Sequence, residues 1–405
     1  MLVRYRFRAY PDGGQAKMLA RSFGCARTVY NDAIWARRKA RAAGESLSDS
    51  EVQRRVVTQA KQTPERAWLA EVSSVVLVQA CQDARRAYRN FFDSIAGKRE
   101  GRKVGAPRFR SRKDHRQSIR FTRNGFTVTR HGVRLAKIGQ VKLVWSRELP
   151  AEPSSVTVIR EADDQYYVSF VVEISAKPLP ASPRVAGVDV GLIDLAAVTY
   201  SDGTREKVYN PRHLRANEKR LAKAQKILSR RQKGSNNRNK ARMRVAVLHR
   251  KVRNTRLDHH HKLASRLIRE NQTVAVEDLA VRGLARTRLA KSVHDAGWAT
   301  LIRLLQEKAI RNGRTVIKID RWFPSTRTCS LCGVVSEPKP LGVRVWECAC
   351  GVRLDRDYNA AVNILDAAGL AESLNACGGN VRLRLAGAVA CEARTHRTAN
   401  VRVPA

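Results

Sequence analysis

Three acidic residues stand where an apolar segment is interrupted or ends. Asp189 interrupts the apolar run at 185–190, and Glu277 directly follows the apolar run at 274–276. Asp357 lies at the start of a segment with helical character. A carboxylate in an apolar strand is costly to bury unless it is paired with a cation or binds one. Each position also has an ordinary explanation: a turn-facing Asp, an acid at a strand end and a helix cap.

The combination of these three acids is more specific than any one of them. An acid on the first of three antiparallel strands, an acid ending the fourth strand and an acid opening the last helix form the arrangement of an RNase H-like nuclease. In that fold the carboxylates converge at one edge of the sheet and together hold two Mg²⁺ ions about 4 Å apart. Oxygen ligands suit Mg²⁺ or Mn²⁺ better than zinc. We therefore predict a two-metal nuclease site at Asp189, Glu277 and Asp357.

Four of the eight cysteines crowd into 22 residues, at Cys329, Cys332, Cys348 and Cys350. Two residues separate the first pair, one separates the second, and Gly333 and Gly351 follow the two pairs. Four thiolates around a tetrahedral Zn²⁺ form a closed structural site. The second pair is one residue shorter than the usual spacing, and reduced cysteines clustered by chance are the alternative. We predict one structural zinc ion.

The charge of the chain points to a polyanionic partner. Lys and Arg number 78 against 36 Asp and Glu, a net charge of +42, while an apolar fraction of 43% is normal for a folded protein. Nucleic acid neutralises such an excess and gains affinity through counterion release. Residues 212–256 hold 17 Lys and Arg and one acid, whereas a merely solvated helix face usually mixes both signs. We predict phosphate contacts there by Arg230, Arg231, Lys233 and Arg242.

Other partners and locations are less favoured by the sequence. No run approaches the roughly 20 apolar residues of a membrane span, and the N-terminal segment has no apolar export signal. We expect a monomeric cytoplasmic protein, associated with the nucleoid when it is bound to DNA. His259, His260 and His261 are consecutive in a basic helical segment, so their rings point in different directions. We predict that these histidines face phosphate or solvent and bind no metal.

The elements that position these residues follow from periodicity. Alternating residues at 1–10 and over 126–172 predict a small β-module or barrel, with a helical insertion from Gln15 to about Phe92 and a turn at residues 11–14. A linker with three prolines spans 177–183. A second domain then has strands at 185–190, 195–200, 207–209, 273–276 and 315–319. Two long basic helices follow its third strand, and the last helix starts near Tyr358.

Several motifs, in this order, resemble the TnpB family, the accessory nucleases of bacterial insertion sequences and relatives of compact type V CRISPR effectors. They lie at residues 90–92, 107–111, 187–191, 228–235, 276–279, 292–298, 322–329 and 355–364. The resemblance covers nearly the whole chain. It implies an RNA-guided DNA endonuclease, in which a transposon-derived omega RNA pairs with double-stranded target DNA beside a short adjacent motif. Carried over by position, Asp189, Glu277 and Asp357 are the nuclease triad, and the four clustered cysteines hold zinc.

The resemblance also implies a fold that mixes α/β and all-β domains. A wedge-type β-barrel (1–10 and 106–180) carries a helical recognition domain (11–105). A RuvC-like nuclease domain (181–320 and 353–375) is interrupted by a zinc-binding module (321–352), and a basic tail (376–405) is disordered. Nucleic-acid contacts are expected in and near the barrel, at Arg108, Arg110, Thr122 and Asn124.

Three other functions remain open from the sequence. A CRISPR-associated effector would use the same chemistry and differ in where its guide is encoded. A nuclease-inactive RNA-guided repressor would lack one of the three acids, and all three are present. A transposase is disfavoured because the cysteine cluster is placed just before the last acid.

Overall fold

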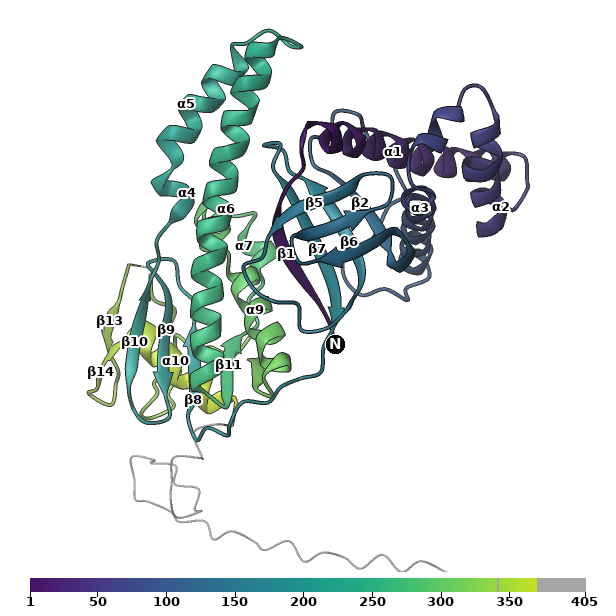
Figure 1. The fold of residues 1–405 in the computed structure, drawn as a ribbon. Helices are drawn as coiled ribbons and strands as arrows, with labels where there is room; N and C mark the ends of the chain where they lie inside the picture. Colours follow the sequence, from purple (N-terminus) through teal and green to yellow (C-terminus); the bar gives the residue numbers. More distant parts are fainter. Residues whose placement is uncertain (341, 370–405) are drawn as a thin grey trace, which may run out of the picture. The chain divides into compact units, whose positions relative to one another are not determined.

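The structure, a computed structural model, describes residues 1–340 and 342–369. The predicted tail at 376–405 and the predicted end of the nuclease domain at 370–375 lie outside the described residues. The chain forms two compact units, one of residues 1–175 with 232–246 and one of residues 176–231 with those from 247 onward. Each unit has its own sheet (Figure 1). Each also has its own hydrophobic core.

The first unit is built on a curled antiparallel sheet that forms a near-closed barrel. Its strand order is β2-β6-β7-β1-β5-β4-β3. The two outer strands, β2 and β3, are joined by Arg123–Gly125 alone, so the sheet must curl until its edges approach. Phe7, Phe121 and Phe170 fill the interior and are fully buried. The strands are β1 (Leu2–Tyr10), β2 (Gln117–Thr122), β3 (Phe126–Thr129), β4 (Gly132–Leu135), β5 (Gly139–Val144), β6 (Pro153–Arg160) and β7 (Tyr166–Glu173).

A helical insertion follows β1, as the sequence predicted, but its start and its continuity differ. Asp12 is the N-cap of α1, because its side chain accepts from the Gln15 N–H at 2.8 Å while Gln15 Oε1 accepts from the Asp12 N–H at 3.1 Å. Residues 13 and 14, predicted as part of a turn, are therefore helical. The insertion is also broken into pieces, namely α1 (Gly13–Ala42), α2 (Asp49–Gln53), the π-helical turn η1 (Arg54–Gln59), η2 (Ala60–Gln62), η3 (Ala67–Glu71) and α3 (Ser74–Ile95).

The second unit contains a mixed five-stranded sheet with strand order β10-β9-β8-β11-β12. Strands β8, β9 and β10 are antiparallel neighbours, whereas β11 runs parallel to both β8 and β12. The strands β8 and β11 are nearly all apolar and buried, as parallel strands covered on both faces usually are. Their bounds are β8 (Val185–Asp189), β9 (Asp194–Tyr200), β10 (Arg205–Tyr209), β11 (Thr273–Glu277) and β12 (Thr315–Ile319).

Helices and a small hairpin complete the second unit. The two basic helices predicted between β10 and β11 are present as α5 and α6, and residues 236–246 of α6 belong to the first unit. The remaining elements are the hairpin strands β13 (Val345–Glu347) and β14 (Arg353–Asp355), and the helices α4 (His213–Ala216), α5 (Glu218–Ser229), α6 (Asn236–Glu270), α7 (Val281–Leu284), α8 (Ala290–Ala296), α9 (Trp298–Arg311) and α10 (Arg356–Ala367).

Candidate metal centres and nucleic-acid interface

Two of the predicted acids lie at the same edge of the mixed sheet. Asp189 is the last residue of β8 and Glu277 the last residue of β11. The two strands are parallel, with Val188 opposite Val276, so Asp189 and Glu277 follow at the next position of each strand. Carboxyl ends of parallel strands meet at one sheet edge. The apolar residues that form these strands therefore also bring the two carboxyl groups together.

A glycine two residues before Asp189 brings the last helix against β8. A Cβ atom at Gly187 would lie 2.2 Å from the Ala361 carbonyl oxygen and 2.9 Å from Leu365 Cβ, so only a glycine permits this approach. Asp357 lies one helical turn before Ala361 on α10. Its charge contributes to the electrostatic environment of Asp189. Because α10 packs closely against Gly187, Asp357 on this helix is brought toward Asp189.

The carboxyl group of Asp189 lies where binding of either a proton or a cation stabilises it. Its side chain is buried, and burial, followed by the charges of Glu277 and Asp357, raises its pKa from 3.8 to about 7. Burial also raises the pKa of Glu277, with a further contribution from the neighbouring Asp278. Buried acids with perturbed pKa values that lie beside one another are typical of functional sites.

Asp357 does not cap α10, although its position in the sequence also suggested that role. Asp355, not Asp357, caps α10, because its Oδ1 accepts from the Asp357 and Tyr358 N–H groups at 3.0 Å each. Asp357 instead contacts two cations. Arg344 Nη1 lies 3.2 Å from its Oδ1, and Lys207 Nζ lies 3.9 Å from its Oδ2. These contacts orient the Asp357 carboxylate and leave it available to a stronger cation.

The donor atoms of the three acids are less compact than those of the cysteine cluster. Among the described residues, the four clustered cysteines are the set of three or more ligand side chains whose donor atoms all lie within 4.8 Å of one another, and the acids are not that compact. Two ions about 4 Å apart share only some of their ligands, so acids on opposite sides need not meet. The donor atoms are carboxylate oxygens, which suit Mg²⁺ or Mn²⁺.

The four cysteines form a compact sulfur cluster. The Sγ atoms of Cys329 and Cys350 lie 3.9 Å apart, and those of Cys332 and Cys348 lie 3.6 Å apart. Four sulfurs at 2.3 Å from a tetrahedral zinc ion would be separated by about 3.8 Å. The short Cys348–Cys350 spacing therefore does not prevent a tetrahedral arrangement. Gly351, with φ of +81°, allows the turn behind this pair, and the cluster is compatible with structural zinc.

Two asparagines that the sequence analysis did not single out join α10 to the cysteine cluster. Asn359 Oδ1 accepts from the Ser330 N–H at 2.8 Å, and Asn359 Nδ2 donates to the Thr328 carbonyl at 2.7 Å. Asn363 Nδ2 donates to the carbonyls of Ser325 and Thr328, both at 2.7 Å. Both side chains are buried. The signal was present in the sequence, since two Asn four residues apart share one face of the otherwise apolar stretch 358–365.

The consecutive histidines differ from the prediction at one position. His260 is buried, and burial lowers its pKa to about 4. A Cβ atom at Gly297 would lie 3.0 Å from His260 Cε1, so this ring packs tightly against the start of α9. The prediction that it faces phosphate or solvent is wrong, because tertiary packing and not the local charge decided its environment.

The predicted nucleic-acid residues have different surroundings. Arg230, Arg231 and Lys233 are exposed between α5 and α6, whereas Arg242 Nη1 donates to the Ala162 carbonyl at 2.7 Å. Arg242 is therefore held by the protein, and a role as an open phosphate contact is disfavoured.

In the first unit, Arg108 and Asn124 are exposed, and Thr122 is half-buried at the end of β2. Arg110 lies over the Tyr30 ring at 3.8 Å and pairs with Asp83 at 3.1 Å. Within the described part of the chain, no helix is long and apolar enough to cross a membrane.

Family models and a solved structure identify the class of fold to which the chain belongs. Family models match residues 169–288 ("Probable transposase"), residues 298–364 (Cas12f1-like, TNB domain) and residues 1–46 (helix-turn-helix domain). Residues 1–46 contain β1 and α1, so the last description does not match the geometry there. A solved Cas12f1 complex with guide RNA and target DNA has a TM-score of 0.54 at 14% identity, covering 86% of this chain and 82% of that one. The barrel, the RuvC-like mixed sheet and the four-cysteine module thus form a Cas12f-like fold.

Curated relatives then define the family. A "Putative RNA-guided DNA endonuclease" of Streptomyces pristinaespiralis is 45% identical over 93% of this chain and 91% of its own length. The "Putative RNA-guided DNA endonuclease InsQ" of Escherichia coli K12 is 29% identical over 93% of this chain and 94% of its own length. The chain belongs to the TnpB family of RNA-guided DNA endonucleases.

Proposed function

We propose that this endonuclease hydrolyses the DNA backbone at a two-metal site formed by Asp189, Glu277 and Asp357. The proposal rests on the burial of Asp189 beside two other acids. A bound cation would offset both the desolvation of its carboxylate and the repulsion between the acids. Two bound Mg²⁺ ions would supply an activated water and stabilise the leaving oxygen. Asp189, Glu277 and Asp357 would hold these ions, and the Asp189 carboxyl group is influenced by the charges of both other acids.

The protein groups around the acids would prepare the site for the metal ions. Asp355 fixes the first turn of α10 and so the position of Asp357. Arg344 and Lys207 hold the Asp357 carboxylate in the metal-free chain. These cations would have to release or share Asp357 when metal binds.

Replacing Asp189 distinguishes a role in cleavage from a role in nucleic-acid binding. We expect Asp189→Ala to abolish Mg²⁺-dependent cleavage while nucleic-acid affinity remains nearly unchanged, because the substitution removes a metal ligand and no phosphate contact. Asp278→Asn is a matched control, since Asp278 follows Glu277 but pairs with Arg321 and Lys318. Cleavage retained by Asp189→Ala, or lost equally in the control, would contradict the assignment.

The guide and the target are expected to be nucleic acids held by charge and by base pairing. We propose that an omega RNA from the transposon end pairs with double-stranded target DNA, and that basic surfaces hold the heteroduplex through its backbone. In this scheme residues 1–10 and 106–180 form the wedge-type barrel, and residues 11–105 recognise the nucleic acid. Purifying the protein from cells that carry its own locus and sequencing the bound RNA tests the proposal. The absence of a discrete bound RNA would contradict it.

The cysteine cluster is proposed to hold one structural zinc ion. Its four sulfur ligands leave no position open for substrate. We expect Cys329→Ser to lower bound zinc, measured by metal analysis, and to lower thermal stability before cleavage chemistry changes. Full stability and activity in a zinc-free protein would show that the cluster has another role.

A further inference from the structure

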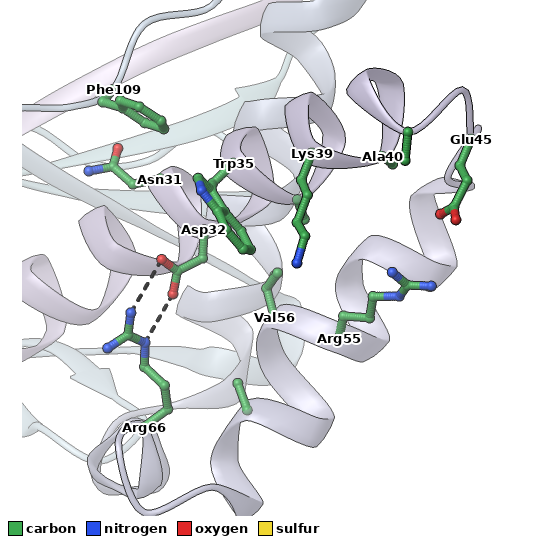
Figure 2. Close-up of a pocket in the computed structure, with 13 residues that line it drawn as sticks. Asn31, Asp32, Trp35, Lys39, Ala40, Glu45, Arg55, Val56, Arg66 and Phe109 are labelled. Atoms are coloured by element: carbon green, nitrogen blue, oxygen red, sulfur yellow. Dashed lines mark hydrogen bonds and ion pairs between the residues drawn. The ribbon is translucent and has the colours of Figure 1, made fainter.

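A hollow of about 960 Å³ opens among the helices of the first unit (Figure 2). Helix α1, the π-helical turn η1 and the segment before β2 all contribute residues to its lining, among them Trp35, Val56 and Phe109. Its size is within the range of small-molecule sites. This hollow lies in the first unit, whereas the candidate metal centres belong to the second, and none of the predicted site residues lines it.

The hollow displays two large aromatic rings that the fold leaves uncovered. Trp35 is 57% exposed and Phe109 is 49% exposed. Lys39 Nζ lies 5.2 Å from the centroid of the Trp35 ring, and Arg38 Cζ lies 4.8 Å from that of Phe109. Arg38 also donates to the Pro107 carbonyl at 2.7 Å and so fixes the segment that carries Phe109. Both rings are therefore held in place while much of their surface remains open.

The wall opposite α1 has an unusual backbone. In η1 the Ala60 N–H donates to the Arg55 carbonyl, the five-residue spacing of a π-helix. Such turns are rare and are concentrated at functional sites, where they redirect side chains at some cost in helix stability. Arg55 and Val56 of this turn both line the hollow. This unusual backbone therefore forms part of the wall of the hollow.

The lining carries both signs of charge, because Lys39, Arg55 and Arg66 are accompanied by Asp32 and Glu45. Asp32 is neutralised by Arg66, whose Nε lies 3.1 Å from Asp32 Oδ2. Arg55 pairs with Glu51, and neither Lys39 nor Glu45 has an ion-pair partner among the residues that the structure describes. An aromatic face beside an unpaired ammonium group is the combination that binds a base by stacking and its phosphate by charge.

We propose that this hollow binds an unpaired nucleotide, with its base stacked on Trp35 and its phosphate beside Lys39. Phe109 forms a second apolar contact for the base. This inference rests on the proposed nucleic-acid function and adds a specific base-binding pocket to it. The pocket recognises the flat face of a base and so tolerates different bases.

An abasic oligonucleotide separates stacking from charge. The probes are a fluorescently labelled single-stranded 12-mer of uridines and an abasic strand of the same length, which carries the same phosphates without bases. Their affinities for the full-length protein are measured by anisotropy. We expect Trp35→Ala to weaken binding of the uridine strand by about 5- to 150-fold, the usual effect of one stacking contact. Binding of the abasic strand should not change.

Two control variants keep the result interpretable. Trp35→Phe should restore most of the affinity because it retains an aromatic face. Trp68→Ala should change neither strand, since Trp68 does not line the hollow and its Nε1 donates to the Glu65 carbonyl at 2.9 Å. An equal loss for both strands in Trp35→Ala, or no loss for either, would overturn the proposal.

A crosslinking measurement locates the base directly. With 5-iodouridine in place of uridine, ultraviolet crosslinks should map by mass spectrometry to Trp35 or Phe109, and their absence from both residues would also overturn the proposal. A thymidine 12-mer distinguishes the source of the nucleotide: equal binding indicates any single strand, and weaker binding indicates RNA. Neither assay requires cleavage, so the pocket can fail while Asp189-dependent cutting stands, and the reverse also holds.

Discussion

Replacing Asp189 with the isosteric, neutral Asn should make the protein more stable when no magnesium is bound. A buried acid whose pKa is raised binds its proton more tightly in the folded protein than in the unfolded chain. Folding stability is therefore lost as the pH rises from the ordinary pKa of 3.8 through the folded value of about 7. At 1.36 kcal/mol per pH unit, the full loss above pH 7 amounts to about 4 kcal/mol.

The Asn side chain carries neither the desolvation cost nor the repulsion from Glu277 and Asp357. Asp189→Asn should thus raise the free energy of unfolding of the second unit at pH 8 by up to about 4 kcal/mol. The corresponding increase in Tm is several degrees, at roughly 2–4 °C per kcal/mol for a unit of this size. At pH 4 the wild-type carboxyl is protonated in the folded protein, and the two proteins should melt together.

The assay is differential scanning calorimetry at pH 4 and pH 8 in magnesium-free buffer, without chelators that would remove zinc. Asp278→Asn is a control that should lower stability at pH 8. The pairing of Asp278 with Arg321 lowers the pKa of Asp278, so the charged carboxylate stabilises the folded protein at this pH. Saturating Mg²⁺ should stabilise the wild type more than Asp189→Asn. Equal stability of the two proteins at pH 8, or a gain that persists at pH 4, would refute the reasoning.

Two further predictions concern the cysteine module and the basic helices. Asn359→Ala should accelerate chelator-driven zinc release and cost about 2–4 kcal/mol, because the Ser330 N–H loses its partner and Thr328 keeps only Asn363. Asn363→Ala should be milder, since Asn359 still binds Thr328, and equal release rates in the two variants would contradict this ranking. Neutralising Arg230, Arg231 and Lys233 together should weaken binding to all sequences and reduce the slope of log affinity against log salt by up to about 3, as followed by filter binding. An unchanged slope would exclude these side chains from phosphate contact.

Local pattern was enough to predict the five strands of the mixed sheet and the basic helices, whereas β2 and β4 of the barrel were missed. Strands β8 and β11 are short runs of Val, Ala and Gly between polar segments, and such runs have few alternatives to a buried strand. The positive charge of α5 and α6 likewise depends only on composition. The cysteine spacing predicted a compact cluster of four sulfurs, because four thiols in a short segment lie close together. These inferences succeeded because each feature is set by residues that are near neighbours in the chain.

Contacts between distant residues decided what the sequence left open. Only the packed structure shows that Asp355 is the cap of α10 and that Asp357 faces Arg344 and Lys207. Likewise, His260 is buried although its neighbours in the sequence are basic, and the hollow at Trp35 exists because separate segments meet there. The sequence by itself determined which groups could do chemistry. The tertiary structure decided which of them meet, because burial and pairing depend on residues that are brought together only when the chain packs.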